Sequence, residues 1–279
     1  MIKHGITLFN VMEDLLDDFE GTIRAVAAAG AQTLEVSAGI GDEKGEIMGI
    51  PVREFQDISK ELGISFVSTF NNFLGSDEEV DIAIHNTAAI GGKDVVLALN
   101  FLDENDVFAT AELANRLGKK VKDAGLTMLY HNHFHEWRVR NGKYLMDMFY
   151  DATDPELVSF EYDTFWAARG GVDPLAYLKK MGKRVKIIHL KDMAATANPV
   201  NLVPLTEGMS NFLSFVLNDM DKSDFVEVGC GALDMKGLVK EGIDLGVDAI
   251  IVEQDNTKLE PLESVRVSMK NLKAILASL

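Results

Sequence analysis

Short apolar segments and longer amphipathic segments alternate eight times along the 279 residues of the chain. The short segments have the length and β-branched composition of buried strands, and the longer ones have the period of helices. Together they predict an α/β fold, a (β/α)8 TIM barrel that forms a single domain over residues 1–279. An open, doubly wound sheet is the alternative. It would favour a glycine-rich turn after the first strand, where no glycine occurs before Gly21.

The strand segments are rich in Val, Ile, Leu and Phe, and glycine often stands directly before them, as in "KELGIS" and "KDAGLT". Glycine there suits the left-handed position that ends a helix, so it marks the boundary between helix and strand. The predicted strands are residues 4–9, 33–37, 64–69, 94–99, 126–133, 157–163, 185–191 and 249–255.

The segments between the predicted strands have helical periodicity. Pro51, Pro174 and Pro261 stand near the starts of these helices, where a missing N–H costs nothing. The pattern is weakest just after the fifth strand. The predicted helices are residues 17–29, 51–62, 78–90, 104–124, 143–152, 172–181, 233–245 and 258–278.

A long loop, residues 192–232, follows the seventh predicted strand. Loops of this length usually carry a function or small elements of their own, and residues 209–218 predict a short extra helix. In a barrel this loop lies on the face that carries active sites, so it is a candidate lid. An inert insertion and an oligomer contact are the alternatives.

The charge balance argues against polyanionic partners. The chain has 44 Asp and Glu against 27 Lys and Arg, and a net charge of −17 repels nucleic acid and anionic membrane surfaces. Cys230 is the only cysteine, so no internal disulfide can form, as is usual in the cytoplasm. No apolar run reaches the roughly 18 residues of a membrane span, and "MIKHGITLFN" lacks the apolar core of a signal peptide. We expect a cytoplasmic protein.

Ionisable residues gather at the carboxyl ends of the predicted strands, which a barrel brings to one face. Charged groups are costly in a core unless they are paired or bind a metal. One set comes from four successive strands: Glu136, Asp163, His189 and Glu253. Three carboxylates and one imidazole suit Mn2+, Mg2+, Co2+ or Zn2+, whereas a structural zinc site would be rich in cysteine. Ordinary salt bridges are the alternative for each residue taken alone.

Five stretches resemble a known family. They are "LYHNHFHEW" (129–137), "FEYDTFWAARGGVDP" (160–174), "VKIIHLKDM" (185–193), "VEVGCGALD" (226–234) and "IIVEQD" (250–255). In them the chain resembles the sugar phosphate isomerase/epimerase family, which has the xylose-isomerase-like TIM barrel. The resemblance implies a divalent metal held by Glu136, Asp163, His189 and Glu253. It also implies that Glu136 and Glu253 act as acid and base.

The activity that this resemblance implies is that of a metal-dependent isomerase or epimerase of a keto-sugar or related polyol, with or without a phosphate. Proton removal next to a metal-bound carbonyl would give an enediolate. A lyase or dehydratase acting on a keto-sugar or keto-inositol is the closer rival, because its first step is the same.

Two more distant readings fit the sequence less well. An abasic-site endonuclease with this barrel would need more histidine ligands than six histidines supply, and the net charge of −17 would repel DNA. A non-catalytic sugar-binding barrel would have an incomplete ligand set.

Residues beside the predicted ligands are expected to contact the sugar. His131 and His133 share one side of their strand. His133 is expected to bind a sugar oxygen or carry a proton, and His131, which lies deeper, to orient a ligand. Lys191 is expected to donate to a hydroxyl or neutralise an enediolate, with an ion pair to Asp163 or Glu161 as the alternative, and Trp166 is expected to pack on the sugar. His135 is expected to face solvent.

The stretch "VGCG" departs from the family, whose members often have a glutamate where this chain has Cys230. The missing carboxylate favours a different substrate, and Cys230 is expected to be a small packed side chain. Backbone N–H groups at residues 229–233 form a candidate phosphate site at a helix start. A small sugar is the expected partner, and a homodimer is possible because family barrels often pair.

Overall fold

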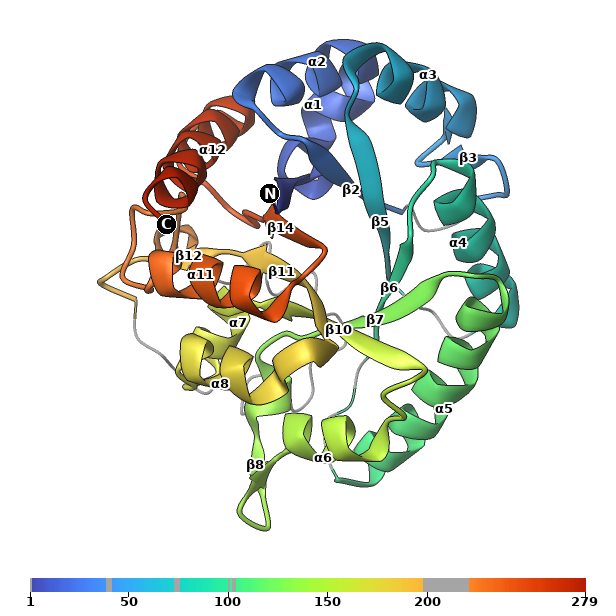
Figure 1. The fold of residues 1–279 in the computed structure, drawn as a ribbon, viewed down its shortest axis with the longest axis vertical. Helices are drawn as coiled ribbons and strands as arrows, with labels where there is room; N and C mark the ends of the chain where they lie inside the picture. The colour runs from blue at the N-terminus through green and yellow to red at the C-terminus, as the bar shows by residue number, and fades with distance from the viewer. Residues whose placement is uncertain (1, 39–41, 73–75, 100, 102–103, 198–220) are drawn as a thin grey trace.

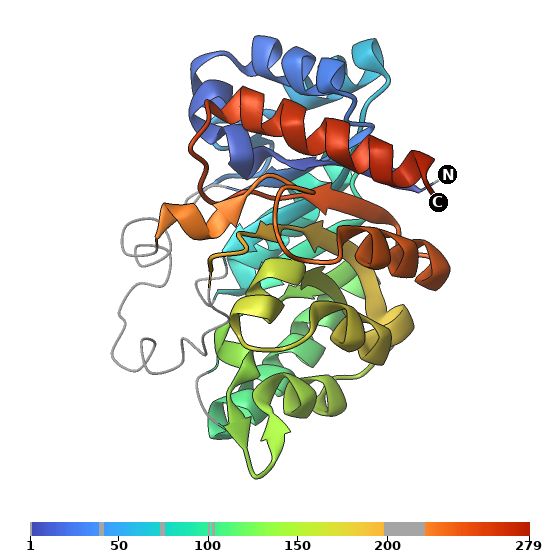
Figure 2. The same cartoon turned by 90° about the vertical axis from the view of Figure 1, so that its left-hand side faces the viewer.

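The computed structural model describes residues 2–38, 42–72, 76–99, 101, 104–197 and 221–279. Eight parallel strands close into a barrel in the order β1-β14-β11-β10-β7-β6-β5-β2, and helices surround it (Figures 1 and 2). The predicted (β/α)8 barrel is therefore confirmed.

The barrel strands overlap all eight predicted strands, because each apolar run is long enough for one strand. They are β1 (Lys3–Thr7), β2 (Thr33–Ser37), β5 (Ser65–Asn72), β6 (Asp94–Ala98), β7 (Thr127–His131), β10 (Val158–Asp163), β11 (Val185–Leu190) and β14 (Ala249–Val252). Three two-stranded antiparallel sheets are added: β3 (Glu46–Ile47) with β4 (Ile50–Pro51), β8 (Val139–Arg140) with β9 (Lys143–Tyr144), and β12 (Asp192–Met193) with β13 (Phe225–Val226).

Every predicted helix in the described part of the chain is present. The α-helices are α1 (Met12–Asp17), α2 (Phe19–Ala29), α3 (Val52–Leu62), α4 (Asp77–Ala89), α5 (Glu104–Asp123), α6 (Leu145–Ala152), α7 (Thr164–Arg169), α8 (Pro174–Met181), α11 (Met235–Leu245) and α12 (Pro261–Ala277). Short 3-10 helices are η1 (Leu8–Val11), η2 (His135–Trp137), η3 (Gly182–Arg184) and η5 (Lys222–Asp224). Helices α1 and α7 escape prediction because six residues are too few for a periodic pattern.

The barrel interior has an apolar layer below a polar one. Val67, Val96, Leu129, Ile187, Ala249 and Ile251 form a cluster separate from the larger core between strands and helices. Side chains two residues apart share a face of a strand, so His131 follows Leu129 and His189 follows Ile187 toward the carboxyl end. The apolar layer thus supports a set of ionisable groups.

The loop predicted at residues 192–232 is described at both ends, where β12 pairs with β13 in an antiparallel arrangement. The helix predicted at residues 209–218 and the middle of the candidate lid, residues 198–220, lie outside the described residues. Among the helices that are described, none combines the length and apolar character needed to cross a membrane.

Candidate metal centre

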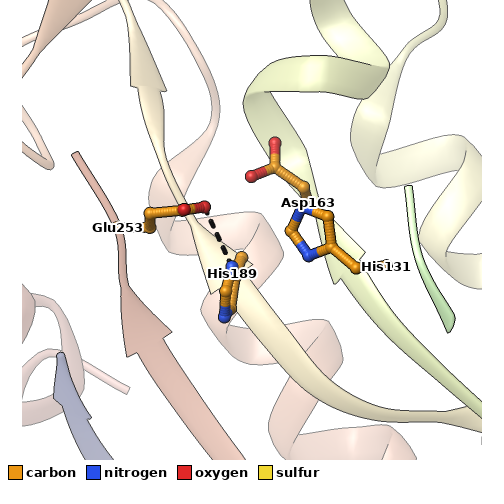
Figure 3. A group of neighbouring side chains, drawn as sticks. All are labelled: His131, Asp163, His189 and Glu253. Carbon is orange, nitrogen blue, oxygen red and sulfur yellow. Dashed lines mark hydrogen bonds and ion pairs between the residues drawn. The ribbon is translucent and has the colours of Figure 1, made fainter. Parts of the chain in front are cut away.

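Four side chains that can bind a metal meet at the carboxyl end of the barrel (Figure 3). One ligand atom from each lies within 4.8 Å of the others, and all four residues are buried. Each comes from the end of a different strand: His131 from β7, Asp163 from β10, His189 from β11 and Glu253 after β14. We call these four the barrel-end group. Three of the four were predicted ligands, and His131 is the fourth member.

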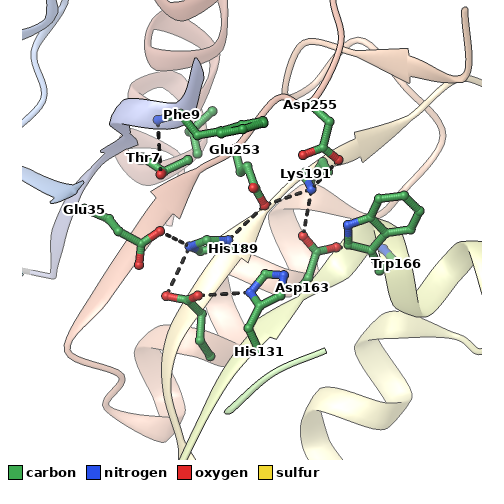
Figure 4. A network of polar contacts seen from close by, with 12 residues as sticks. Thr7, Phe9, Glu35, His131, Asp163, Trp166, His189, Lys191, Glu253 and Asp255 are labelled. Carbon is green, nitrogen blue, oxygen red and sulfur yellow. Dashed lines mark hydrogen bonds and ion pairs between the residues drawn. The ribbon is translucent and has the colours of Figure 1, made fainter. Parts of the chain in front are cut away.

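A buried ammonium lies among the carboxylates of this group (Figure 4). Lys191 Nζ lies 3.1 Å from Asp163 Oδ2, 2.8 Å from Glu253 Oε2 and 2.8 Å from Asp255 Oδ2. Burial alone would lower the pKa of Lys191, but these three carboxylates raise it above its ordinary value. The lysine therefore stays charged, and it pairs with Asp163 as one sequence-based reading proposed.

Two more carboxyl groups lie deeper in the barrel. Glu161 Oε2 is 3.0 Å from His131 Nδ1, and Glu161 Oε1 is 3.1 Å from His189 Nε2. Glu35 Oε1 lies 2.9 Å from the same His189 nitrogen, and the Ser68 hydroxyl donates to Glu35 Oε2 at 2.8 Å. Sequence reasoning placed Glu35 and Glu161 at strand ends but left both out of the ligand set, and gave Glu161 only the role of an alternative partner for Lys191. The available signal was a glutamate two residues before the end of a largely apolar strand.

Local hydrogen bonds set the position of Asp163. Its Oδ1 accepts from the backbone N–H of Trp166 at 2.6 Å and so caps helix α7. The side chain of Asn132 bonds both backbone groups of Asp163, at 3.0 and 3.2 Å. Asp163 Oδ2 is buried and has no hydrogen-bond partner among the described residues, although the Lys191 ammonium lies 3.1 Å away.

The donor set tests whether the residues suit a metal. A buried carboxylate oxygen is costly unless a cation neutralises it, and for Asp163 Oδ2 the Lys191 ammonium at 3.1 Å already does so. The Asp163 carboxylate lies among two imidazoles and a second carboxylate, a donor set that suits borderline divalent ions. The barrel-end group fits a divalent metal.

Electrostatic coupling fixes the charge states. Burial would raise the pKa of Glu253, but Lys191 and His189 hold it well below its usual range. Burial opposes the protonation of His189, yet Glu161, Glu35 and Glu253 raise its pKa well above the ordinary value. Burial lowers the pKa of His131 well below its usual range and raises that of Asp163 to about 7. Glu253 is thus a carboxylate and His131 a neutral imidazole near neutral pH, the forms that bind metals, whereas a metal at His189 would have to displace the proton that its raised pKa retains.

Glu136, the remaining predicted ligand, lies in a neighbouring group with His133 and His135. Its Oε1 accepts from the Tyr130 hydroxyl at 2.7 Å and from the His133 backbone N–H at 2.9 Å. The 3-10 helix η2 turns the chain after His133, so Glu136 reaches back to β7. The two groups adjoin, since the ring centroids of His131 and His133 lie 4.8 Å apart.

Three residues predicted to contact substrate, His133, Lys191 and Trp166, lie beside the barrel-end group. The half-buried His133 has its ring 5.8 Å from that of Trp166, and Lys191 Nζ lies 5.2 Å from the Trp166 ring. The expectation that His135 faces solvent is wrong. Helix η2 turns its side chain inward, where it packs near Phe101 and Phe134.

The predicted phosphate site at residues 229–233 is also not supported. The Asp192 carboxylate accepts from the backbone N–H groups of Gly229, Gly231 and Leu233 at 2.9 to 3.2 Å, so these donors are already used. Cys230 is exposed rather than packed, because this turn carries its side chain away from the core.

Comparison with known proteins agrees with the fold and the motifs. No family model matches the chain. An inosose dehydratase from Clostridium perfringens is 30% identical over 175 residues, which cover 62% of this chain. The match spans 56% of that protein, little more than half of its length.

Solved structures cover nearly the whole chain. A sugar phosphate isomerase/epimerase from Parabacteroides distasonis superposes with a TM-score of 0.75 at 22% identity, over 98% of this chain and 94% of that one. The IOLI protein, solved with a bound zinc atom, superposes with a TM-score of 0.68 at 14% identity, over 99% of each chain. The fold is thus that of the sugar phosphate isomerase/epimerase and xylose-isomerase-like barrels, as the sequence motifs predicted.

Proposed function

We propose that the protein is a divalent-metal-dependent enzyme that removes a proton beside the carbonyl of a keto-sugar or keto-inositol. The observation that carries the proposal is the buried barrel-end group with the charged Lys191 among its carboxylates. The similarity to inosose dehydratases supports the substrate class, and the fold of sugar isomerases is consistent with it.

His131, Asp163, His189 and Glu253 would hold the metal, and His131 takes the place that the sequence resemblance gave to Glu136. A divalent cation bound there would polarise the substrate carbonyl and stabilise negative charge on its oxygen. Glu253 is the most exposed member of the group and stays ionised, so its Oε1 is suited to accept the proton from carbon. Lys191 keeps its charge and can donate to a substrate oxygen as charge develops there.

Loss of water is the outcome that we favour for this step. After proton transfer to Glu253, a hydroxyl on the next carbon leaves as water with a proton from an acid at the site. The named dehydratases among the sequence relatives support this outcome. So does the position of Glu136, because epimerisation by Glu136 and Glu253 needs both side chains at the substrate, and Tyr130 and His133 hold Glu136 outside the barrel-end group.

Isomerisation or epimerisation is the second candidate. The position of His133 favours it, since this half-buried imidazole adjoins His131 and can serve as a second proton carrier. The substrate and the first step are the same.

Incubation in D2O tests both outcomes. The protein is loaded in turn with Mn2+, Co2+, Mg2+ and Zn2+, mixed with an inosose or with ketohexoses, and followed by 1H NMR. Dehydration gives new enone signals, whereas isomerisation or epimerisation gives deuterium incorporation without loss of water. The Glu253→Gln variant is the control and should show neither. Absence of both with every metal and every keto-substrate would refute the proposal.

A further inference from the structure

We propose that Asn10 is a positioning residue for Glu253. Its side-chain amide holds the backbone on both sides of this glutamate and so sets where the carboxylate can meet the metal. The inference rests on the proposed function for the metal, but the contacts that carry it lie within the protein alone. No sequence motif gives Asn10 a role.

Glu253 stands where β14 loses its neighbouring strands. The last residue of β14, Val252, pairs with Ile6 of β1 on one side and with Leu190 of β11 on the other. One residue further on, the Glu253 N–H donates to the Leu190 carbonyl at 3.4 Å, which is longer than a typical backbone hydrogen bond. On the opposite side, β1 ends at Thr7 and the chain turns into helix η1. The backbone around Glu253 therefore needs another partner on the β1 side.

Asn10, on helix η1, is that partner. Its Nδ2 donates to the Val252 carbonyl at 3.1 Å, and its Oδ1 accepts from the Gln254 N–H at 2.9 Å, so the two bonds bracket Glu253. The bracket needs one donor and one acceptor, which an amide supplies and a carboxylate does not. Val252 and Gln254 are buried and Asn10 is half-buried, so water has little access to either bond.

The same device recurs at two neighbouring strand ends. Asn132, which follows β7, bonds both backbone groups of Asp163 at the end of β10. Thr164, which follows β10, accepts from the Lys191 N–H at 3.0 Å and lies 2.8 Å from the Lys191 carbonyl, just beyond β11. In each case, as with Asn10, the side chain comes from the adjacent strand of the barrel. Polar side chains thus continue the strand pairing as far as the residues that form the site.

The position of Glu253 decides several contacts at once. Its Oε2 lies 2.9 Å from His189 Nδ1 and 2.8 Å from Lys191 Nζ. Loss of the Asn10 bracket would free the backbone that carries this carboxylate, and the carboxylate would no longer be held in the barrel-end group. Hydrogen-bonding partners behind a metal ligand commonly contribute in this way to the affinity for the metal.

Asn115 on α5 offers a matched control. Its Nδ2 donates to the Ala152 carbonyl at 3.3 Å and its Oδ1 accepts from the Asp154 N–H at 2.7 Å, so it brackets Thr153 as Asn10 brackets Glu253. Asn115 is also half-buried, but these bonds join α5 to the end of α6 in the helical layer outside the barrel (Figure 1). Asn115→Ala therefore removes the same pair of hydrogen bonds as Asn10→Ala without a contact to the site.

The test measures Co2+ affinity by competition with a chelator, the visible absorption spectrum of bound Co2+, and urea unfolding in the wild type, Asn10→Ala and Asn115→Ala. We expect Asn10→Ala to bind Co2+ about 10- to 100-fold more weakly and to change the spectrum, which reports the arrangement of the ligands. Asn115→Ala should keep the wild-type affinity and spectrum, while both variants unfold at lower urea concentrations by similar shifts. Wild-type affinity and spectrum in Asn10→Ala, or an equal loss of affinity in Asn115→Ala, would overturn the inference and leave the proposed function standing.

Hydrogen exchange in the metal-free wild type decides the matter if Asn10→Ala does not fold. The Gln254 N–H should exchange slowly although it lies beyond the end of β14, because Asn10 holds it. Exchange as fast as that of exposed loop amides would overturn the inference. A wild type that binds no Co2+ would instead refute the proposed function, while exchange at Gln254 would still decide whether Asn10 holds this segment.

Discussion

Buried carboxyl groups occur at both ends of the barrel, but their surroundings differ. At the carboxyl end, Glu253 lies 2.8 Å from the Lys191 ammonium and 2.9 Å from His189. At the opposite end, Asp94 begins β6 with a buried Oδ2 that has no hydrogen-bond partner among the described residues. A second carboxylate, Asp248, acts on Asp94 and disfavours its ionisation.

The difference shows in the two pKa values. Lys191 and His189 hold the pKa of Glu253 well below its usual range despite burial, whereas burial and Asp248 raise the pKa of Asp94 to about 7. Burial raises the pKa of Asp163 to about 7 as well, so neither burial nor a raised pKa identifies a functional carboxylate. The two ends differ in the cationic groups within ion-pair distance of the carboxyl groups, which only the carboxyl end of the barrel supplies among the described residues named here.

The largest expected effect comes from removing one member of the barrel-end group. His131→Ala removes one ligand imidazole and leaves Glu161 Oε2 without its partner. We expect metal affinity to fall by more than about 100-fold, the upper range for residues that only support a ligand, and metal-dependent turnover to fall with it. Chelator competition measures the first quantity and the D2O assay the second. If His131→Ala bound the metal as tightly as the wild type, the fourth ligand would be Glu136 and not His131.

Much of the fold could be predicted because its signals are local. A run such as residues 185–191 has the composition of a strand by itself, and Asp163, His189 and Glu253 could be grouped because all stand at strand ends. Helix α7 gave no such signal, since six residues hold less than two helical turns.

The remaining parts of the site depend on contacts that no local pattern encodes. Glu136 stands near a strand end, but helix η2 turns it toward Tyr130. Glu35 and Glu161 meet at His189 only because the barrel closes and brings β2 and β10 to a common interior. Spacing in the sequence carries no information about that meeting.

Asp94 supplies the next largest effect and sharpens the contrast between the ends. Because its pKa is raised from 3.8 to about 7 in the folded protein, the folded state binds the proton more tightly than the unfolded chain. Protonation of Asp94 makes its full contribution to the free energy of unfolding below about pH 4, and this contribution is lost as the pH rises through about 7. Asp94→Asn should therefore exceed the wild type in unfolding free energy by up to about 4 kcal/mol at pH 8, and by little at pH 4.

Urea unfolding at several pH values measures this difference. Asp248→Asn is the matched control: it removes the like charge but leaves Asp94 buried, so its gain should be smaller and follow the same pH range. A gain in Asp94→Asn that does not change with pH would contradict the raised pKa.

The smallest expected effect concerns Glu136, a buried carboxylate at the carboxyl end but outside the barrel-end group. Glu136→Gln keeps an acceptor for Tyr130 and His133 but places an amide N–H2 at the position of Oε2, a buried oxygen that lies 3.4 Å from His135 Nδ1 and has no hydrogen bond within the part of the chain that the structure describes. We expect unfolding free energy to fall by about 1–3 kcal/mol while metal affinity stays at the wild-type value. Urea unfolding and chelator competition on the same samples separate the two effects. A loss of metal as large as that in His131→Ala would instead make Glu136 a ligand, and would mean that metal binding draws the two neighbouring groups into one site.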